Sequence, residues 1–183
     1  MPRIVLATFL FLATALPAVA QSATATARLG PGQIATITAV REVGEPARLE
    51  IALPKGTQRF DGVGEQFLTI KSGGKDSVIV VADLNGDGID EIAVRGSVTA
   101  DASAVFVYRW DGDRGEYLPT DFTADGQDEG KPFLFVDAAS TVTIDRSGAI
   151  EVNTTRTDQS GRTSSVLERY RWDGNGFKYA ADH

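Results

Sequence analysis

The sequence lacks cysteine altogether, and its single histidine, His183, is the last residue. Without cysteine there can be no thiolate nucleophile, no disulfide and no thiolate-bound zinc. Without an internal histidine, a Ser-His-Asp triad lacks its base. Scattered carboxylates could form a glycosidase pair, but most of them are explained below as metal ligands or turn residues. We therefore expect a protein that is not an enzyme.

Positive charge is also scarce. The 183 residues contain 18 Lys and Arg against 25 Asp and Glu, a net charge of −7. Non-specific binding to nucleic acid depends on Lys and Arg contacts to phosphates, so this balance argues against a nucleic-acid partner. Beyond residue 20 no apolar stretch is long enough to cross a bilayer. We expect no membrane span and no nucleic acid among the partners.

The first twenty residues have the pattern of a signal peptide. Arg3 precedes an apolar run from Ile4 to Leu16, and Pro17 is followed by Ala18-Val19-Ala20. Signal peptidase accepts small residues at these last positions, which predicts cleavage after Ala20. The alternative, an uncleaved anchor, is disfavoured because the run is too short to span a hydrocarbon core of ~30 Å. We expect a protein of the periplasm or the extracellular space, with a net charge of −8 once Arg3 is removed.

Almost every later apolar stretch has the two-residue period of β-strands, and none has a 3.6-residue helical stripe. The breaks are turn sequences, such as Ser72-Gly73-Gly74 and Asp173-Gly174-Asn175-Gly176. The sequence predicts an all-β fold of antiparallel hairpins. Residues 21–32, which are small and polar, are expected to form a flexible lead-in. Residues 33–183 are expected to form a single domain, present as a monomer.

One segment recurs within this domain. Tyr108-Arg-Trp-Asp-Gly112 is repeated 62 positions later as Tyr170-Arg-Trp-Asp-Gly174. The same separation of 62 positions relates Asp83 to Asp145. Repeated β-hairpin units are typical of propellers and arrays. Closing the hairpins into a propeller-like ring would also remove exposed sheet edges. We expect a small β-propeller-like arrangement, with a β-sandwich as the alternative.

The segment 83–91 carries the most specific chemistry. Oxygen donors stand at its positions 1, 3, 5 and 9, the carbonyl of position 7 adds another, and Gly88 at position 6 permits a sharp turn. A donor set made only of oxygen suits Ca²⁺, with Mg²⁺ second because it demands a tighter octahedron. Asp90 competes with Glu91 for the last position. The expected calcium ligands are Asp83, Asn85, Asp87, Ile89 (carbonyl) and Glu91.

The flanking residues distinguish this loop from an EF-hand. An EF-hand closes with Glu at position 12 and lies between helices, whereas here apolar residues on both sides predict a β-hairpin over residues 77–95. The pattern resembles the FG-GAP (VCBS) repeat, the calcium-loop blade of integrin-type propellers. The resemblance implies the same five ligands. Glu91 departs from it, because the family more often has Asp at that position.

In its layout over about residues 65–180, the chain is also similar to small exported calcium-loop proteins of Gram-negative bacteria. Some of these are periplasmic immunity proteins that inhibit lysozyme-like peptidoglycan hydrolases. The similarity implies a protein-binding module with a basic lytic enzyme as partner, which an acidic chain would attract. The alternative is an adhesion or matrix module that binds glycans or surface proteins. The acidic segment 119–132 is either a solvated connection or a partner-facing loop.

Overall fold

A computed structural model describes residues 20–158 and 160–181. Over these residues the chain forms strands and turns without a helix, which confirms the all-β expectation. The same part of the chain therefore includes no helix that could cross a membrane. The expected signal peptide falls on residues 1–19, outside the described part, apart from Ala20.

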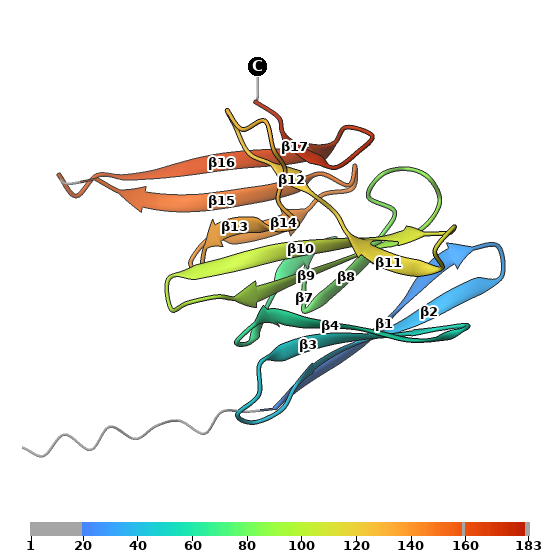
Figure 1. The fold of residues 1–183 in the computed structure, drawn as a ribbon. Coiled ribbons are helices and arrows are strands. Elements are labelled where there is room, and N and C mark those ends of the chain that lie inside the picture. Colours follow the sequence, from blue (N-terminus) through green and yellow to red (C-terminus); the bar gives the residue numbers. More distant parts are fainter. Residues whose placement is uncertain (1–19, 159, 182–183) are drawn as a thin grey trace, which may run out of the picture.

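The strands form three sheets stacked in layers, called here lower, middle and upper as in Figure 1. The lower sheet contains β1 (Gln21–Gly30), β2 (Gln33–Arg41), β3 (Ala47–Leu53) and β4 (Gly56–Gly64). The middle sheet contains β5 (Phe67–Leu68), β8 (Ile79–Ala82), β9 (Glu91–Ser97), β10 (Ala102–Asp111), β11 (Glu116–Pro119) and β13 (Leu134–Asp137). The upper sheet contains β6 (Ile70–Ser72), β7 (Lys75–Ser77), β12 (Phe122–Thr123), β14 (Thr141–Ile144), β15 (Ile150–Thr157), β16 (Thr163–Trp172) and β17 (Phe177–Tyr179).

The middle sheet is covered on both faces, because alternate side chains of a strand point to opposite sides. Ile92 and Val94 of β9 belong to a core shared with the lower sheet, which includes Ile37 and Leu49. Ala93 of the same strand belongs to a second core, shared with the upper sheet. Every residue of β9 is buried as a result. Stacked layers with two cores match the sandwich alternative rather than blades arranged around an axis.

The expectation of a flexible lead-in at residues 21–32 is wrong. Residues 21–30 form strand β1, which pairs with β2 from Gln21↔Arg41 onwards. The segment alternates Thr with Ala before it reaches Leu29, and its apolar side chains face the core: Ala27 is 1% exposed and Leu29 4%. Alanine gives a weak periodic signal in sequence, but it fits where two sheets approach closely, so tertiary packing decides the structure here.

The internal repeat is present in the structure. The strand series β8-β9-β10-β11 and β14-β15-β16-β17 are both antiparallel meanders, one in the middle and one in the upper sheet. Both copies of the YRWDG segment end a long strand, and each tryptophan contacts an aromatic ring on the next strand. The ring centroids are 5.4 Å apart for Trp110 and Tyr117, and 5.7 Å apart for Trp172 and Phe177. The repeated sequence therefore encodes a repeated hairpin.

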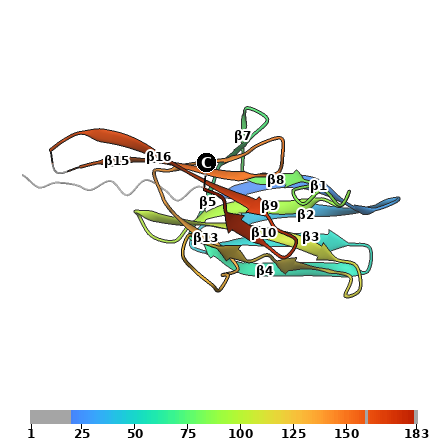
Figure 2. The same cartoon turned by 90° about the horizontal axis from the view of Figure 1, so that it is seen from above.

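The upper sheet carries a projecting hairpin, which extends from the body in both views (Figures 1 and 2). It is formed by the ends of β15 and β16, from the pair Thr154↔Val166 to the pair Thr157↔Thr163. The third strand, β14, pairs with β15 only as far as Asn153. We call residues 154–166 the β15–β16 arm.

Candidate metal loop

A hairpin is present within the expected residues 77–95, as β8, a loop at residues 83–90, and β9. It begins at Ile79, because Ser77 belongs to β7 and pairs with Ile70 in the upper sheet. The two strands pair antiparallel and close on Ala82↔Glu91. The loop stands at one end of the middle sheet, where it is drawn in green in Figure 1. Gly86 and Gly88 have φ angles of 82° and 86°. This left-handed backbone suits glycine and lets the loop curl.

Three of the four polar side chains of the loop bind its own main chain. Asp83 accepts hydrogen bonds from the N–H groups of Gly86 (2.7 Å) and Gly88 (2.9 Å). Asn85 Oδ1 accepts one from the N–H of Asp87 at 2.9 Å, and Asp87 Oδ1 accepts one from the N–H of Ile89 at 2.8 Å. The side-chain oxygens at positions 1, 3 and 5 thus hold the curl in place.

Glu91 closes the loop from inside the protein. Its side chain is almost completely buried, with 1% of the residue exposed. Oε2 accepts a hydrogen bond of 2.7 Å from the N–H of Leu84, whereas Oε1 is buried without a partner among the described residues. Burial raises the pKa of Glu91 to about 7, against the lowering effect of the N–H groups of Leu84 and Asn85, and the negative charges of Asp87 and Asp83 add to the increase. An unpartnered buried carboxylate oxygen is costly unless something neutralises it.

Asp90, the competing candidate for the last position, points elsewhere. Its carboxylate accepts hydrogen bonds from the N–H of Arg28 at 2.8 Å and from the Arg28 guanidinium at 2.6 Å. Burial raises the pKa of Asp90, but the hydrogen bonds and charge of Arg28 outweigh burial and leave the pKa below its usual value. Tyr117 donates a hydrogen bond of 3.1 Å to the Asp90 carbonyl. Asp90 therefore anchors the loop to β1 and leaves Glu91 as the acid that faces into it.

The two-residue period of β9 explains this division. Asp90 lies two positions before Ile92, so both side chains point toward the lower sheet. Strand β1, which carries Arg28, belongs to that sheet. Glu91 lies two positions before Ala93, so both side chains point toward the upper sheet. Sequence analysis missed Arg28 and Tyr117, because contacts between residues 62 and 27 positions apart leave no local signal.

The loop does not hold its oxygen donors in the arrangement of a formed metal site. In the described part of the chain, no three His, Cys, Asp or Glu side chains stand together as a ready metal-binding group. The oxygens of Asp83, Asn85 and Asp87 are engaged by main-chain N–H groups, so these side chains would have to turn to bind an ion. Glu91 Oε1 needs no such change, because it already lacks a partner. The donor set is all oxygen, so the residues fit Ca²⁺.

The corresponding turn of the second copy, residues 145–149, is satisfied without a metal. Asp145 Oδ1 accepts hydrogen bonds of 2.7 Å from both the N–H and the hydroxyl of Ser147. This turn also packs against the metal loop: a Cβ added to Gly148 would lie 2.4 Å from the carbonyl oxygen of Leu84. Gly148 therefore allows the upper sheet to support the loop.

Replacing Gly148 with alanine should destabilise the protein by about 2 kcal/mol or more, because strain in the left-handed region (~1–2 kcal/mol) adds to the clash with Leu84. Gly161→Ala is the matched control. Both glycines have a φ of 80°, but the space around Gly161 is open. Urea unfolding monitored by tryptophan fluorescence measures both variants. Equal losses for the two would show that the contact with Leu84 carries no weight.

Comparison of the chain with family models, curated proteins and solved structures gives no match. The assignment of a function therefore depends on the loop and its surroundings.

Proposed function

We propose that the chain is an exported protein with one structural Ca²⁺ in the loop 83–91, and that its function is to bind a partner protein. The proposed ligands are the five oxygen donors expected from the spacing: Asp83, Asn85, Asp87, the Ile89 carbonyl and Glu91. One observation carries this proposal. Glu91 Oε1 is buried beside the loop without a hydrogen bond, and a cation is the partner that would satisfy it.

A cation would also relieve repulsion within the loop. Burial is the largest cause of the raised pKa of Glu91, and the charges of Asp87 and Asp83 raise it further. A divalent ion reverses this effect, because it favours the charged form of every carboxylate around it. Calcium fits better than magnesium because it tolerates irregular oxygen cages, whereas magnesium keeps several waters in a tight octahedron.

The loop is placed where an ion would stabilise the whole fold. It belongs to the middle sheet, Asp90 ties it to Arg28 of the lower sheet, and Leu84 contacts the Gly148 turn of the upper sheet. This position supports a structural role for the metal. It also accounts for a buried carboxylate with a raised pKa, which in a cleft would suggest a catalytic acid.

The β15–β16 arm supports a protein-binding role. The residues of the arm that the structure describes lie outside both cores, yet its tip is hydrogen-bonded: Asp158 Oδ1 accepts hydrogen bonds from the Ser160 N–H (2.9 Å) and the Arg162 N–H (2.9 Å). A two-stranded hairpin adds little to the stability of a fold by itself. We infer that the arm serves as the surface that binds the partner. The net negative charge favours a basic partner, and the layout resemblance points to a lysozyme-like peptidoglycan hydrolase.

A pull-down from periplasmic extract tests the proposed function. The bait is the protein in calcium, compared with a variant in which Asn-Gly replaces residues 155–165 and joins the paired residues Thr154 and Val166. We expect the intact protein to retain a basic lytic enzyme and to slow its lysis of cell walls, and the shortened variant to do neither. If both baits retain the enzyme equally, the arm is not the binding surface; if neither retains a protein, the proposed function is wrong.

A further inference from the structure

The β15–β16 arm has an unpaired edge on the side of β16. Strand β17 pairs with β16 only at residues 170–172, and the ladder ends with a hydrogen bond of 2.7 Å from the N–H of Ala180 to the carbonyl of Arg169. In the described part of the chain, no strand pairs with the rest of β16 on that side. The free edge therefore extends from Thr163, where β16 begins, to Glu168.

The main-chain groups of alternate residues point out from this edge. In an antiparallel strand, the N–H and C=O of one residue point to the same side, and those of its two neighbours point to the other side. The carbonyl of Arg169 points toward β17. It follows that the N–H and C=O groups of Thr163, Ser165 and Leu167 point toward the free edge, where they can bind a further strand.

The free edge lacks the features that prevent strands from pairing. Natural sheets protect exposed edges with charged residues, proline or bulges. The edge strand β4 of the lower sheet has such protection, because it carries Arg59 and Asp61 and its pairing with β3 shifts register. The segment from Thr163 to Leu167 contains no charged residue, proline or glycine, and its pairing with β15 is regular. Because the arm also stands away from the body (Figures 1 and 2), another strand can reach it.

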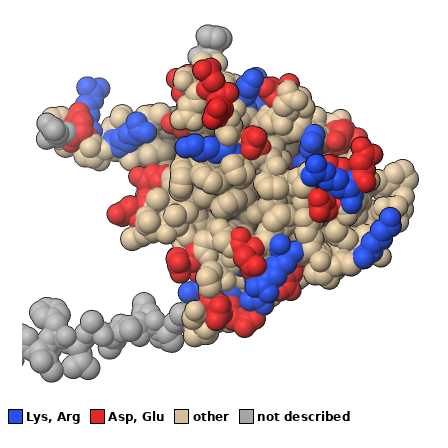
Figure 3. Space-filling view, in the orientation of Figure 1, with Lys and Arg blue, Asp and Glu red and all other residues tan. Residues whose placement is uncertain are grey.

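Arg162, at the tip of the arm, carries a free positive charge. It is the residue before β16, it is exposed, and it takes part in no salt bridge with the described residues. Figure 3 shows basic side chains on the arm, whereas acidic side chains gather at the top of the body. The tip can therefore contact an acidic surface of another molecule.

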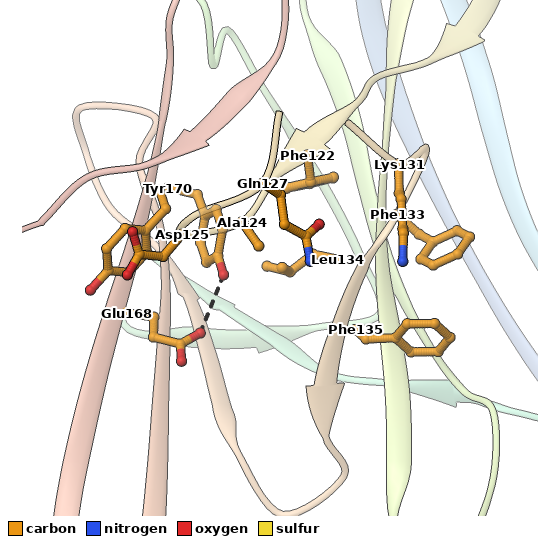
Figure 4. Close-up of a pocket in the computed structure, with 11 residues that line it drawn as sticks. Phe122, Ala124, Asp125, Gln127, Lys131, Phe133, Leu134, Phe135, Glu168 and Tyr170 are labelled. Carbon is orange, nitrogen blue, oxygen red and sulfur yellow. Dashed lines mark hydrogen bonds between the residues drawn. The ribbon is translucent and has the colours of Figure 1, made fainter. Parts of the chain in front are cut away.

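An acidic recess adjoins the other end of the free edge. Glu168 and Asp125 lie near the hydroxyl of Tyr170, with Lys131 on the opposite side of the recess (Figure 4). The hydroxyl of Tyr170 donates a hydrogen bond of 3.2 Å to Glu168 Oε2. Among the described residues, neither carboxylate takes part in a salt bridge. The two ends of the free edge thus carry complementary charges.

We propose that the protein forms a symmetric dimer in which the free β16 edges of two copies pair antiparallel. Pairing over the whole free edge aligns Thr163 with Leu167 of the second copy and Ser165 with Ser165. This alignment uses the three residues whose main-chain groups point outward. It also places Arg162 opposite Glu168 of the second copy on the same face of the sheet, and opposite charges in that position stabilise a strand pair. Twofold symmetry forms each of these contacts twice.

Other registers lose these contacts. A shift of one residue pairs outward-pointing groups with inward-pointing ones. A shift of two residues toward the body places Thr163 of the second copy opposite Arg169, whose carbonyl already accepts the hydrogen bond from Ala180. The opposite shift separates Arg162 from Glu168. The free edge therefore selects one register.

The dimer goes beyond the proposed function and does not depend on it. It replaces the monomer expected from the sequence. It leaves the β15 edge of the arm, residues 154–157, open to the partner protein, because β14 pairs with β15 only as far as Asn153. If the dimer forms but the pull-down retains no protein, only the proposed function fails. If a lytic enzyme is retained by a protein that stays monomeric, only the dimer fails.

A cysteine at the twofold axis tests the pairing directly. The chain has no cysteine, so Ser165→Cys introduces a single thiol. In a hydrogen-bonded antiparallel pair the Cα atoms lie ~5.5 Å apart, within the range of a disulfide. We expect mild oxidation to convert Ser165→Cys into a covalent dimer. The matched control is Thr155→Cys, on the opposite edge of the arm, which should react about tenfold more slowly or less. Equal rates for the two variants would overturn the proposal.

Proline substitutions separate the two edges of the arm. Thr155 lies directly opposite Ser165, so its main-chain groups point toward the β15 edge. Ser165→Pro removes an N–H that binds the second copy, whereas Thr155→Pro removes one that does not. Sedimentation equilibrium should show a dissociation constant raised about tenfold or more by Ser165→Pro, since symmetry removes two hydrogen bonds, and changed much less by Thr155→Pro. Equal effects, or a monomer at every concentration, would contradict the pairing.

Charge reversal tests the register without changing the backbone. Arg162→Glu and Glu168→Arg should each weaken the dimer, because like charges then face one another across the axis. The combined variant Arg162→Glu/Glu168→Arg should restore the wild-type dissociation constant, measured in the same sedimentation experiment. A combined variant as weak as the sum of the two single changes would show that these residues do not face one another.

Discussion

On addition of calcium, chelator-treated protein is expected to gain about 2.7 kcal/mol in free energy of unfolding once free Ca²⁺ reaches ~100 times its dissociation constant. The gain arises because the ion binds the folded loop and not the unfolded chain. For a domain of this size the corresponding rise in melting temperature is ~5–11 °C. Thermal unfolding in EGTA and in calcium, monitored by tryptophan fluorescence, measures it.

Asp87→Ala should abolish most of this gain, because it removes a central ligand. It also removes the hydrogen bond from the Ile89 N–H, so the quantity compared is the response to calcium and not the stability in its absence. Asp113→Ala is the matched control, since it removes an exposed aspartate from another turn. An equal response to calcium in both variants would show that the ion stabilises the protein at some other place.

In the absence of calcium, stability is expected to fall by about 2–3 kcal/mol between pH 5 and pH 8. Glu91 has a pKa of about 7 in the folded protein, whereas an unfolded glutamate has a pKa of ~4.3. The folded state therefore binds more protons between these values, and stability is lost as pH rises through 7 and is constant above it. The aspartates with lowered pKa, such as Asp145 and Asp173, change stability only at lower pH.

Urea unfolding at a series of pH values in EGTA measures this dependence. Glu91→Gln should flatten the curve over pH 5–8, because the group that titrates is removed while the shape of the side chain is kept. Calcium should flatten the wild-type curve by a different route, since a bound cation keeps Glu91 ionised throughout. A steep curve that persists in Glu91→Gln would place the titrating group elsewhere.

The sequence predicted the features that depend on local pattern. Two-residue periodicity and glycine turns indicate strands and hairpins wherever they occur, and they placed the loop between β8 and β9 correctly. The repeated YRWDG segment, at Tyr108–Gly112 and Tyr170–Gly174, predicted two equivalent hairpins. This prediction succeeded because each tryptophan packs against a ring on the next strand, which lies close to it in the sequence.

Features that depend on the third dimension could not be predicted in this way. The strand at residues 21–30 is stabilised by a sheet formed far along the chain, and its alanines carry little hydrophobic signal of their own. The choice between Asp90 and Glu91 depends on which neighbour covers each face of β9. The sandwich arrangement follows from the double burial of the middle sheet, which the order of the strands alone does not show.

The central claim, that residues 83–91 bind calcium, is tested most directly by calorimetric titration of chelator-treated protein with CaCl₂. We predict saturable binding of one Ca²⁺ per chain, with release of about half a proton at pH 7 as Glu91, which is half protonated there, becomes fully ionised, and no measurable binding to Asp87→Ala. Absence of binding heat for the wild-type protein in buffers of different ionisation enthalpy, or an unchanged isotherm for Asp87→Ala, would contradict it.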